Sequence, residues 1–243
     1  MNQHLDTDLD AAPARERAAA LARLPELLGS PTLRILSVAT TGLRQAHPVQ
    51  IVVLDGDGRT LLDTLVHTDQ PIEPDAQALH GVQAAQLADA PRLAQVMEDL
   101  ERLTWYGNDV VAFNPGFTID ALVRACRAQG VEAFGMGHWV DGQALLTPIC
   151  GVYNWTRGAW GRLSLAQAIG QQPMPGHFAA IGTALGNAQR LAYLLRWHGT
   201  PQDAPAEPEA ETSGCRECWR HGQPDCGFAC YPPSDAHVHE DRA

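Results

Sequence analysis

Residues 33–43 read LRILSVATTGL, and this stretch decides the fold. The apolar run at 33–39 predicts a buried strand, and it is followed directly by a Thr-Thr-Gly turn segment. Two further strands are predicted at 49–54 and 60–67, with the sequence DGDG at 55–58 supplying the hairpin turn between them. Three short antiparallel strands therefore open the fold.

The spacing of apolar residues changes from a strand period to a helix period after Pro71. Antiparallel strands followed by alternating strands and helices imply an α/β fold, with a mixed five-stranded sheet flanked by helices. The later strands are predicted at 109–113 and 139–141, and the helices at 91–103, 117–129, 164–169 and 183–197, with a further helix running through Leu146.

The chain divides into four predicted parts. Residues 1–30 form an N-terminal helical arm in which Asp10 caps an Ala-rich helix, and residues 31–199 form the main domain. Residues 200–214 are rich in Pro, Ala and Glu and cannot bury enough apolar surface to fold, which predicts a flexible linker. Residues 215–243 are a small Cys-rich C-terminal tail.

Several motifs between residues 33 and 197 resemble the DEDDh (DnaQ-like) 3'-5' exonucleases, the family of DNA polymerase proofreading subunits. Residues 37–43 (SVATTGL) resemble the family's Asp-x-Glu-Thr-Thr-Gly-Leu, and residues 71–82 (PIEPDAQALHGV) are a more specific match. Residues 112–118 (AFNPGFT) are similar to the His-Asn-x-x-Phe-Asp motif, and His177 with the helix that follows resembles the final His-x4-Asp motif. The resemblance implies a ribonuclease H-like exonuclease fold.

The resemblance also implies where four metal-binding carboxylates would stand, and each of these positions is neutral. The first Asp falls on Ser37, the Glu on Ala39 and the third acid on Thr118, while the last falls on Gly182, or on Thr183 in the helix register. No shift of register restores the first or last acid, because neither 27–54 nor 142–202 contains Asp or Glu. Magnesium ions depend on carboxylate charge, so we expect no magnesium in this groove and no catalytic residues.

The same motifs provide candidate residues for binding a nucleic-acid end or a nucleotide. Aromatic rings such as Phe113 and Phe117 offer stacking faces, unless they simply pack the core. Tyr153, Trp155 and Trp160, in a loop that also carries arginine, add a possible aromatic and cationic rim. The candidate binding residues are Thr40, Thr41, Gly42, Leu43, His80, Asn114, Phe117 and His177.

The charge of the chain is strongly acidic but unevenly distributed. A net charge of -11 argues against nonspecific capture of nucleic acid. The stretch 142–202, however, has four arginines and no acid, which makes it net +4. The N-terminus is acidic and lacks an apolar run, so we expect neither a signal peptide nor a membrane span, and a cytoplasmic location.

The tail contains four closely spaced thiols, and His221 lies among them. One Cys-x2-Cys pair with a second close pair is typical of a structural zinc site, and a metal supplies the folding free energy that so short a segment cannot gain by burial. An iron-sulfur cluster is the alternative, and disulfides are disfavoured in a reducing cytosol. The predicted ligands are Cys215, Cys218, Cys226 and Cys230, with His221 as a possible replacement for one thiolate.

The sequence thus predicts a catalytically inactive exonuclease-fold protein that binds nucleic acid or a nucleotide and carries a structural zinc tail. One alternative is a weakly active 3'-5' exonuclease that uses His177 together with Asp141 and a metal held by substrate phosphates. A second alternative is a protein-interaction scaffold whose partner is another protein.

Overall fold

The computed structural model describes residues 11–105, 107–132, 137–170 and 172–200. None of the helices in these ranges has the length and apolar character that crossing a bilayer requires. The predicted linker, the Cys-rich tail and the predicted cap Asp10 lie outside the described residues. The elements are α2 (Ala12–Leu28), β1 (Leu33–Thr40), β2 (Pro48–Asp55), β3 (Thr60–Leu65), α3 (Pro74–His80), α4 (Ala84–Ala88), α5 (Leu93–Thr104), β4 (Asp109–Ala112), α6 (Pro115–Gln129), β5 (His138–Asp141), α7 (Gly142–Cys150), β6 (Tyr153–Asn154), β7 (Ala159–Trp160), α8 (Leu165–Ile169) and α9 (Ala184–Gly199).

The main sheet is mixed and five-stranded, in the order β3-β2-β1-β4-β5. β1 pairs antiparallel with β2, where Ser37 lies opposite Val52, and parallel with β4, where Ile35 lies opposite Val111. β2 and β3 are antiparallel, and β4 and β5 are parallel. The predicted α/β fold with a mixed five-stranded sheet is confirmed.

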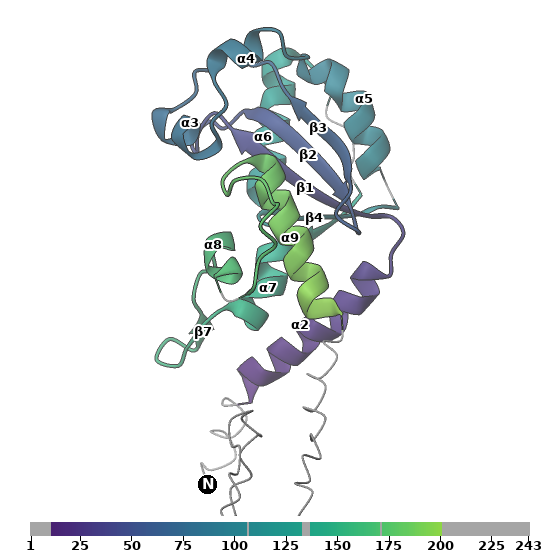
Figure 1. Cartoon of the computed structure of the whole chain (residues 1–243), viewed down its shortest axis with the longest axis vertical. Helices are drawn as coiled ribbons and strands as arrows, with labels where there is room; N and C mark the ends of the chain where they lie inside the picture. Colours follow the sequence, from purple (N-terminus) through teal and green to yellow (C-terminus); the bar gives the residue numbers. More distant parts are fainter. Residues whose placement is uncertain (1–10, 106, 133–136, 171, 201–243) are drawn as a thin grey trace, which may run out of the picture. The chain divides into compact units, whose positions relative to one another are not determined.

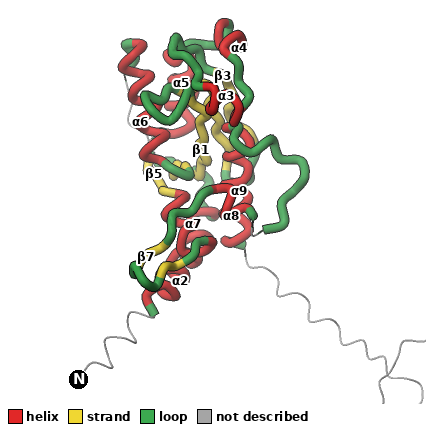
Figure 2. Tube along the Cα trace, turned by 90° about the vertical axis from the view of Figure 1, so that its left-hand side faces the viewer, coloured by secondary structure: helices red, strands yellow, loops and turns green. Residues whose placement is uncertain are grey.

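Helices cover both faces of the sheet. Successive side chains of β1 point to opposite sides and therefore enter different cores. Ile35 joins a core formed with α2, α7, α8 and α9, whereas Leu36 joins a second core formed with α5 and α6. Figure 1 shows α9 in front of the sheet and α6 behind it, and Figure 2 shows the same layers from the side. The domain is therefore a three-layer α/β/α arrangement around β1.

The first described helix, α2, packs against the last one, α9, and against α7. Leu24 of α2 is completely buried, and Leu27 beside it is 7% exposed. The contact is close at Gly199, where an added Cβ would lie 2.9 Å from Leu24 Cβ and 2.5 Å from Leu28 Cδ1. Glycine at position 199 thus allows the two helices to meet.

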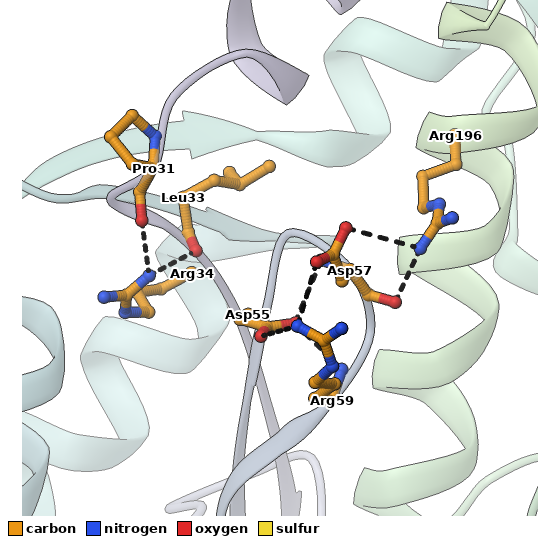
Figure 3. Close-up of polar contacts among 7 residues, drawn as sticks. All are labelled: Pro31, Leu33, Arg34, Asp55, Asp57, Arg59 and Arg196. Carbon is orange, nitrogen blue, oxygen red and sulfur yellow. Dashed lines mark hydrogen bonds and ion pairs between the residues drawn. The ribbon is translucent and has the colours of Figure 1, made fainter.

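The turn between β2 and β3 is closed by its own acid and attached to α9 (Figure 3). Asp55 Oδ1 accepts hydrogen bonds from the backbone N–H groups of Asp57 and Arg59, both at 2.9 Å. Arg196 of α9 donates to the backbone oxygen of Asp57 at 2.6 Å and lies 3.9 Å from its carboxylate. The DGDG segment therefore forms the predicted turn and also links the sheet to the helical layer.

Four short elements are absent from the sequence-based prediction. They are α3, α4 and the two-residue strands β6 and β7. α3 begins after Glu73, which has an extended backbone, and ends at Gly81, whose φ of 75° is left-handed and suits glycine. These elements are too short for an apolar period to reveal them.

Candidate functional site

A cleft of about 570 Å³ lies where the C-terminal half of β1 meets α6, α7, α8 and α9. Five residues that the sequence singled out line it: Ser37, Leu43, Asn114, Phe117 and Thr118. The other lining residues are Leu36, Val38, Leu79, Phe113, Gln143, Arg162, Leu163, Ser164, Leu165, Gln167 and Asn187. The cleft thus collects residues from six separate segments of the chain.

Two of the positions expected to carry acids, Ser37 and Thr118, line this cleft, and both have hydroxyl side chains. Ser37 points to the α9 side of β1, the same side as Ile35 and Ala39. Thr118 is buried in the first turn of α6, where its Oγ1 donates to the Asn114 backbone oxygen at 3.1 Å. Asn114 caps that helix by accepting from Phe117 N at 3.1 Å. Ala39 is buried and is not among the residues that line the cleft.

The residue that α9 contributes to the cleft is Asn187, which the sequence analysis did not single out. It lies on the same helix face as the buried residues Ala184 and Leu191, three positions before and four after it. A polar side chain among the apolar residues on the buried face of the helix is the signal that could have found it. Its Oδ1 accepts from Gly182 N at 3.0 Å, which leaves the amide Nδ2 as a donor toward the cleft.

Gly182, the position counted for the last acid, lies outside the cleft lining. Its φ is +94°, and an added Cβ would lie 2.7 Å from both the side chain and the backbone oxygen of Leu79. A side chain at 182 would therefore strain the backbone and displace α3. The alternative position, Thr183, caps α9 by accepting from Gly186 N at 2.9 Å.

His177 is exposed and is not among the cleft residues. Its ring packs edge-to-face against Phe178, with the two ring centroids 5.0 Å apart. Phe178 in turn packs against Tyr193 of α9 and lies 6.0 Å below the Arg190 guanidinium. The structure thus places His177 in an aromatic cluster on the outside of α9, apart from Ser37 and Thr118.

The Thr-Thr-Gly segment is held by internal hydrogen bonds. Thr40 and Thr41 are both buried. Thr40 Oγ1 donates to Gly42 O at 2.9 Å, and Thr41 Oγ1 accepts from His47 N at 3.1 Å. A second bond, from Thr41 N to His47 O at 2.9 Å, closes the loop that carries Leu43. These hydroxyls therefore shape the cleft edge rather than point into it.

His80 supports the same segment from α3. Its ring is 7% exposed, lies 3.2 Å from the Thr40 backbone oxygen through Nε2, and accepts from Val82 N at 3.0 Å through Nδ1. Because Nδ1 accepts, the hydrogen of the neutral ring is on Nε2, where it donates to Thr40. Burial lowers the pKa of His80 below its ordinary value, against the smaller opposing effect of the Thr40 bond.

Two leucines form an apolar edge of the cleft. Leu43 is 84% exposed and Leu79 is 62% exposed, and both line the cavity. A Cβ added at Gly42, beside Leu43, would lie 2.2 Å from the Glu73 carboxyl carbon, so the Glu73 side chain would have to move. Two exposed leucines at one edge, opposite the partly buried rings of Phe113 and Phe117, make this cleft suitable for a flat apolar group.

The charge of the cleft is what separates it from a two-metal site. Among the described residues that line it, Arg162 is the one charged residue, and the polar remainder are hydroxyls and amides. Nowhere in the described ranges do three His, Cys, Asp or Glu side chains gather to hold a metal ion. Asp141 is exposed and caps α7 by accepting from Ala144 N at 2.8 Å. The described donors therefore do not fit a pair of divalent ions, which require carboxylate ligands.

The two cysteines in the described ranges are buried and reduced. Burial raises the pKa of Cys126 on α6, and it raises the pKa of Cys150 to about 11. Cys150 Sγ lies 3.3 Å from His198 Nε2, so the sulfur has a partner on α9 that sequence alone did not identify. The four tail cysteines lie outside the described residues.

Known proteins resemble this chain both in sequence and in fold. Exodeoxyribonuclease 10 of Escherichia coli K12 is 36% identical over 88 residues, which cover 35% of this chain and 38% of that protein. The match thus spans less than two fifths of the relative's length. No family model matches the chain.

Solved structures of exonucleases share the fold. E. coli exonuclease I in complex with a dT13 oligonucleotide aligns with a TM-score of 0.54 at 11% identity, over 70% of this chain and 41% of that one. A 3'-exonuclease, from a structure of 3'-end specific recognition of a histone mRNA stem-loop, aligns with a TM-score of 0.51 at 13% identity, over 68% and 80%. The predicted ribonuclease H-like exonuclease fold is confirmed.

Proposed function

We propose that the cleft binds a nucleic-acid end or a nucleotide without metal ions and does not cleave it. The observation that carries this proposal is the lining itself, which combines aromatic rings, hydroxyls, amides and Arg162 with no carboxylate among its described residues. Exonuclease-fold proteins support the ligand class, since one relative by fold is seen with an oligonucleotide.

The chemistry of the lining suits an anion better than a cation. A phosphate group finds donors in Ser37, in the Asn187 amide and in the Arg162 guanidinium, whereas a magnesium ion finds no anionic ligand there. Replacing carboxylates by neutral groups also removes their repulsion of phosphates. A base finds stacking partners in Phe113 and Phe117.

Hydrolysis, by contrast, lacks its machinery. In a two-metal site the ions generate the nucleophile and stabilise the leaving oxygen. His177, which the alternative hypothesis used as a base, is not among the cleft residues, and Asp141 is bound to the start of α7. We therefore expect a ligand to be held intact.

The direct test is binding with and without metal. A fluorescent mononucleotide and a single-stranded oligonucleotide are titrated with the full chain at low salt, once in EDTA and once in magnesium. The expected affinities are equal in both. Arg162→Ala should weaken both ligands, and Arg102→Ala, an exposed arginine paired with Asp99 on the other helical layer, is the matched control.

Two outcomes would contradict the proposal. Steady shortening of the oligonucleotide in magnesium or manganese, abolished by His177→Ala, would favour the weakly active exonuclease. Absence of binding at low salt would instead favour the protein-interaction scaffold.

For the tail, we propose a structural zinc ion held by Cys215, Cys218, Cys226 and Cys230. The support is the spacing of these residues in the sequence. Elemental analysis of the purified chain is expected to find zinc that Cys215→Ser removes. A zinc-free chain whose stability is unchanged by this substitution would exclude the site.

A further inference from the structure

The strands β6 and β7 form a small antiparallel hairpin built on three aromatic rings. Tyr153 pairs with Trp160 across the hairpin, and Gly161 N extends the pairing by donating to Val152 O at 2.9 Å. The Tyr153 ring meets Trp155 edge-to-face at 4.9 Å and Trp160 at 5.2 Å. Trp160 also donates through Nε1 to the Glu16 carboxylate of α2, so the hairpin is fixed to the domain.

The outer side of this hairpin is unusually apolar for a surface. Trp155 is 62% exposed and Val152 is 77% exposed. Packing within the domain therefore does not account for the Trp155 ring. Its neighbour Tyr153 holds it from one side, which leaves much of the indole surface accessible to a ligand.

The charge around these rings is positive. Arg157 is exposed in the hairpin turn, where its backbone N–H donates to Asn154 O at 3.1 Å. From residue 142 to residue 202 the sequence has no Asp or Glu, although the whole chain is at -11. Among the described residues, Glu16 contacts the hairpin and accepts a hydrogen bond from Trp160. A polyanion is the partner that this charge favours.

The hairpin is also continuous with the cleft. β7 ends at Trp160, and Arg162 and Leu163, which follow directly, line the cavity. Figure 1 shows β7 beside α7 and below α8. Arg162 of the cleft lining therefore lies two residues after the end of the hairpin.

We propose that this hairpin is a stacking platform for single-stranded nucleic acid whose end lies in the cleft. The proposal rests on the proposed function of the cleft and extends it from one terminal nucleotide to a strand. Bases stack on Trp155, and Arg157 contacts the backbone phosphate. A duplex keeps its base faces covered, so the platform selects single strands, and stacking makes the selection tolerant of sequence.

The test compares ligands of different length on hairpin and cleft variants of the full chain. Affinities for a mononucleotide, a single-stranded octamer and the same octamer in a duplex are measured by fluorescence anisotropy at several salt concentrations. Trp155→Ala is expected to weaken octamer binding about tenfold while leaving the mononucleotide unaffected. Trp155→Tyr retains a ring and should bind like the parent. Trp105→Ala, at another exposed tryptophan, is the control for a general loss of surface aromatics.

Salt dependence gives an independent measure of the arginine. Arg157→Ala should lower the slope of log affinity against log salt by about 0.7, the change expected for one phosphate contact on a single strand. Thermal unfolding of each variant verifies that the domain remains folded. The platform would be overturned if the parent protein bound the octamer no more tightly than the mononucleotide. Equal octamer affinities for the parent and for Trp155→Ala would also overturn it.

The cleft variant Arg162→Ala separates this inference from the one before it. Loss of mononucleotide binding in Arg162→Ala with no effect of Trp155→Ala would leave the cleft proposal standing and remove the platform. Octamer binding that depends on Trp155 but not on Arg162, with no mononucleotide binding, would leave the platform standing and remove the cleft proposal.

Discussion

His80 and Thr40, forty positions apart in the chain, are joined by a buried contact of 3.2 Å between the imidazole Nε2 and the threonine carbonyl oxygen. Through Nδ1 the same ring accepts from Val82 N. His80 therefore connects the end of β1 to the start of the segment after α3, and it does so as a neutral ring. Although the sequence analysis counted it as a binding residue, its observed contacts hold the cleft edge in place.

Replacing His80 by alanine should destabilise the domain by about 1–3 kcal/mol, because a buried carbonyl and a buried amide lose their partner. Urea unfolding of the two proteins measures the difference. His80→Gln, which can both donate and accept, should lose less than the alanine variant. Equal stability of all three proteins would show that water replaces the ring without cost.

The stability of the domain should fall as the pH falls through the ordinary histidine pKa. Burial lowers the pKa values of His47, His80 and His198 in the folded protein, with Arg124 adding to the effect at His47 and Arg17 at His198. Below a pH of about 6.5 the unfolded chain therefore binds more protons than the folded one, so the free energy of unfolding decreases.

Urea titrations between about pH 5.5 and pH 7.5 measure this loss. The His80→Gln variant should show a shallower dependence than the parent, because one of the three groups is gone. A parent protein whose unfolding free energy is constant over that range would contradict the prediction.

Leu24→Ala should cost about 2–5 kcal/mol of stability, since the side chain is completely buried between α2 and α9. Urea unfolding by circular dichroism is the measurement. Leu43→Ala, at an 84% exposed leucine, is the matched control and should change stability little. A small effect at Leu24 would mean that α2 separates from α9 in solution.

Introducing carboxylates into the cleft should create magnesium affinity. The triple variant Ser37→Asp, Thr118→Asp and Asn187→Asp places three anions among residues that line one cavity. Calorimetric titration with magnesium should show binding to this variant and none to the parent. The variant with asparagine at 37 and 118 is the neutral control, and equal binding by all three proteins would argue against a neutral cleft.

The two buried thiols should be unreactive in the folded protein. With the four tail cysteines replaced by serine, Cys126 and Cys150 remain, and the pKa of Cys150 is raised to about 11. A thiol-specific colorimetric reagent near neutral pH should react slowly in buffer and rapidly with two thiols in urea, because the thiolate is the reactive form. Rapid reaction of two thiols in buffer would contradict the burial of Cys126 and Cys150.

The main elements of the fold could be predicted because each extends over enough residues for its apolar pattern to be recognised in the sequence. The apolar run at 33–39 specifies a strand that needs no neighbour to be recognised, and the apolar period at 91–103 specifies α5 within two residues at its start. α3 could not be found in this way, because it has seven residues and follows a Pro-rich segment. Its end depends on the left-handed backbone at Gly81, which only the folded chain reveals.

The cleft was predictable where a motif fixes the register and not elsewhere. Ser37 and Thr118 are found in the cleft because the motifs around them lie on regular elements. Asn187 was missed because counting forward from His177 assumes a fixed spacing to the last helix. Gly182 instead packs against Leu79, and the α9 residue that lines the cavity is Asn187, four positions after Thr183.

The pairing of α2 with α9 has a consequence for how the domain assembles. The first described helix, α2, completes its packing only after α9, at the other end of the domain, has been synthesised. Contacts between such distant parts of a chain slow folding. During translation, Leu24 and the other apolar residues of α2 therefore remain exposed to water until α9 has been made.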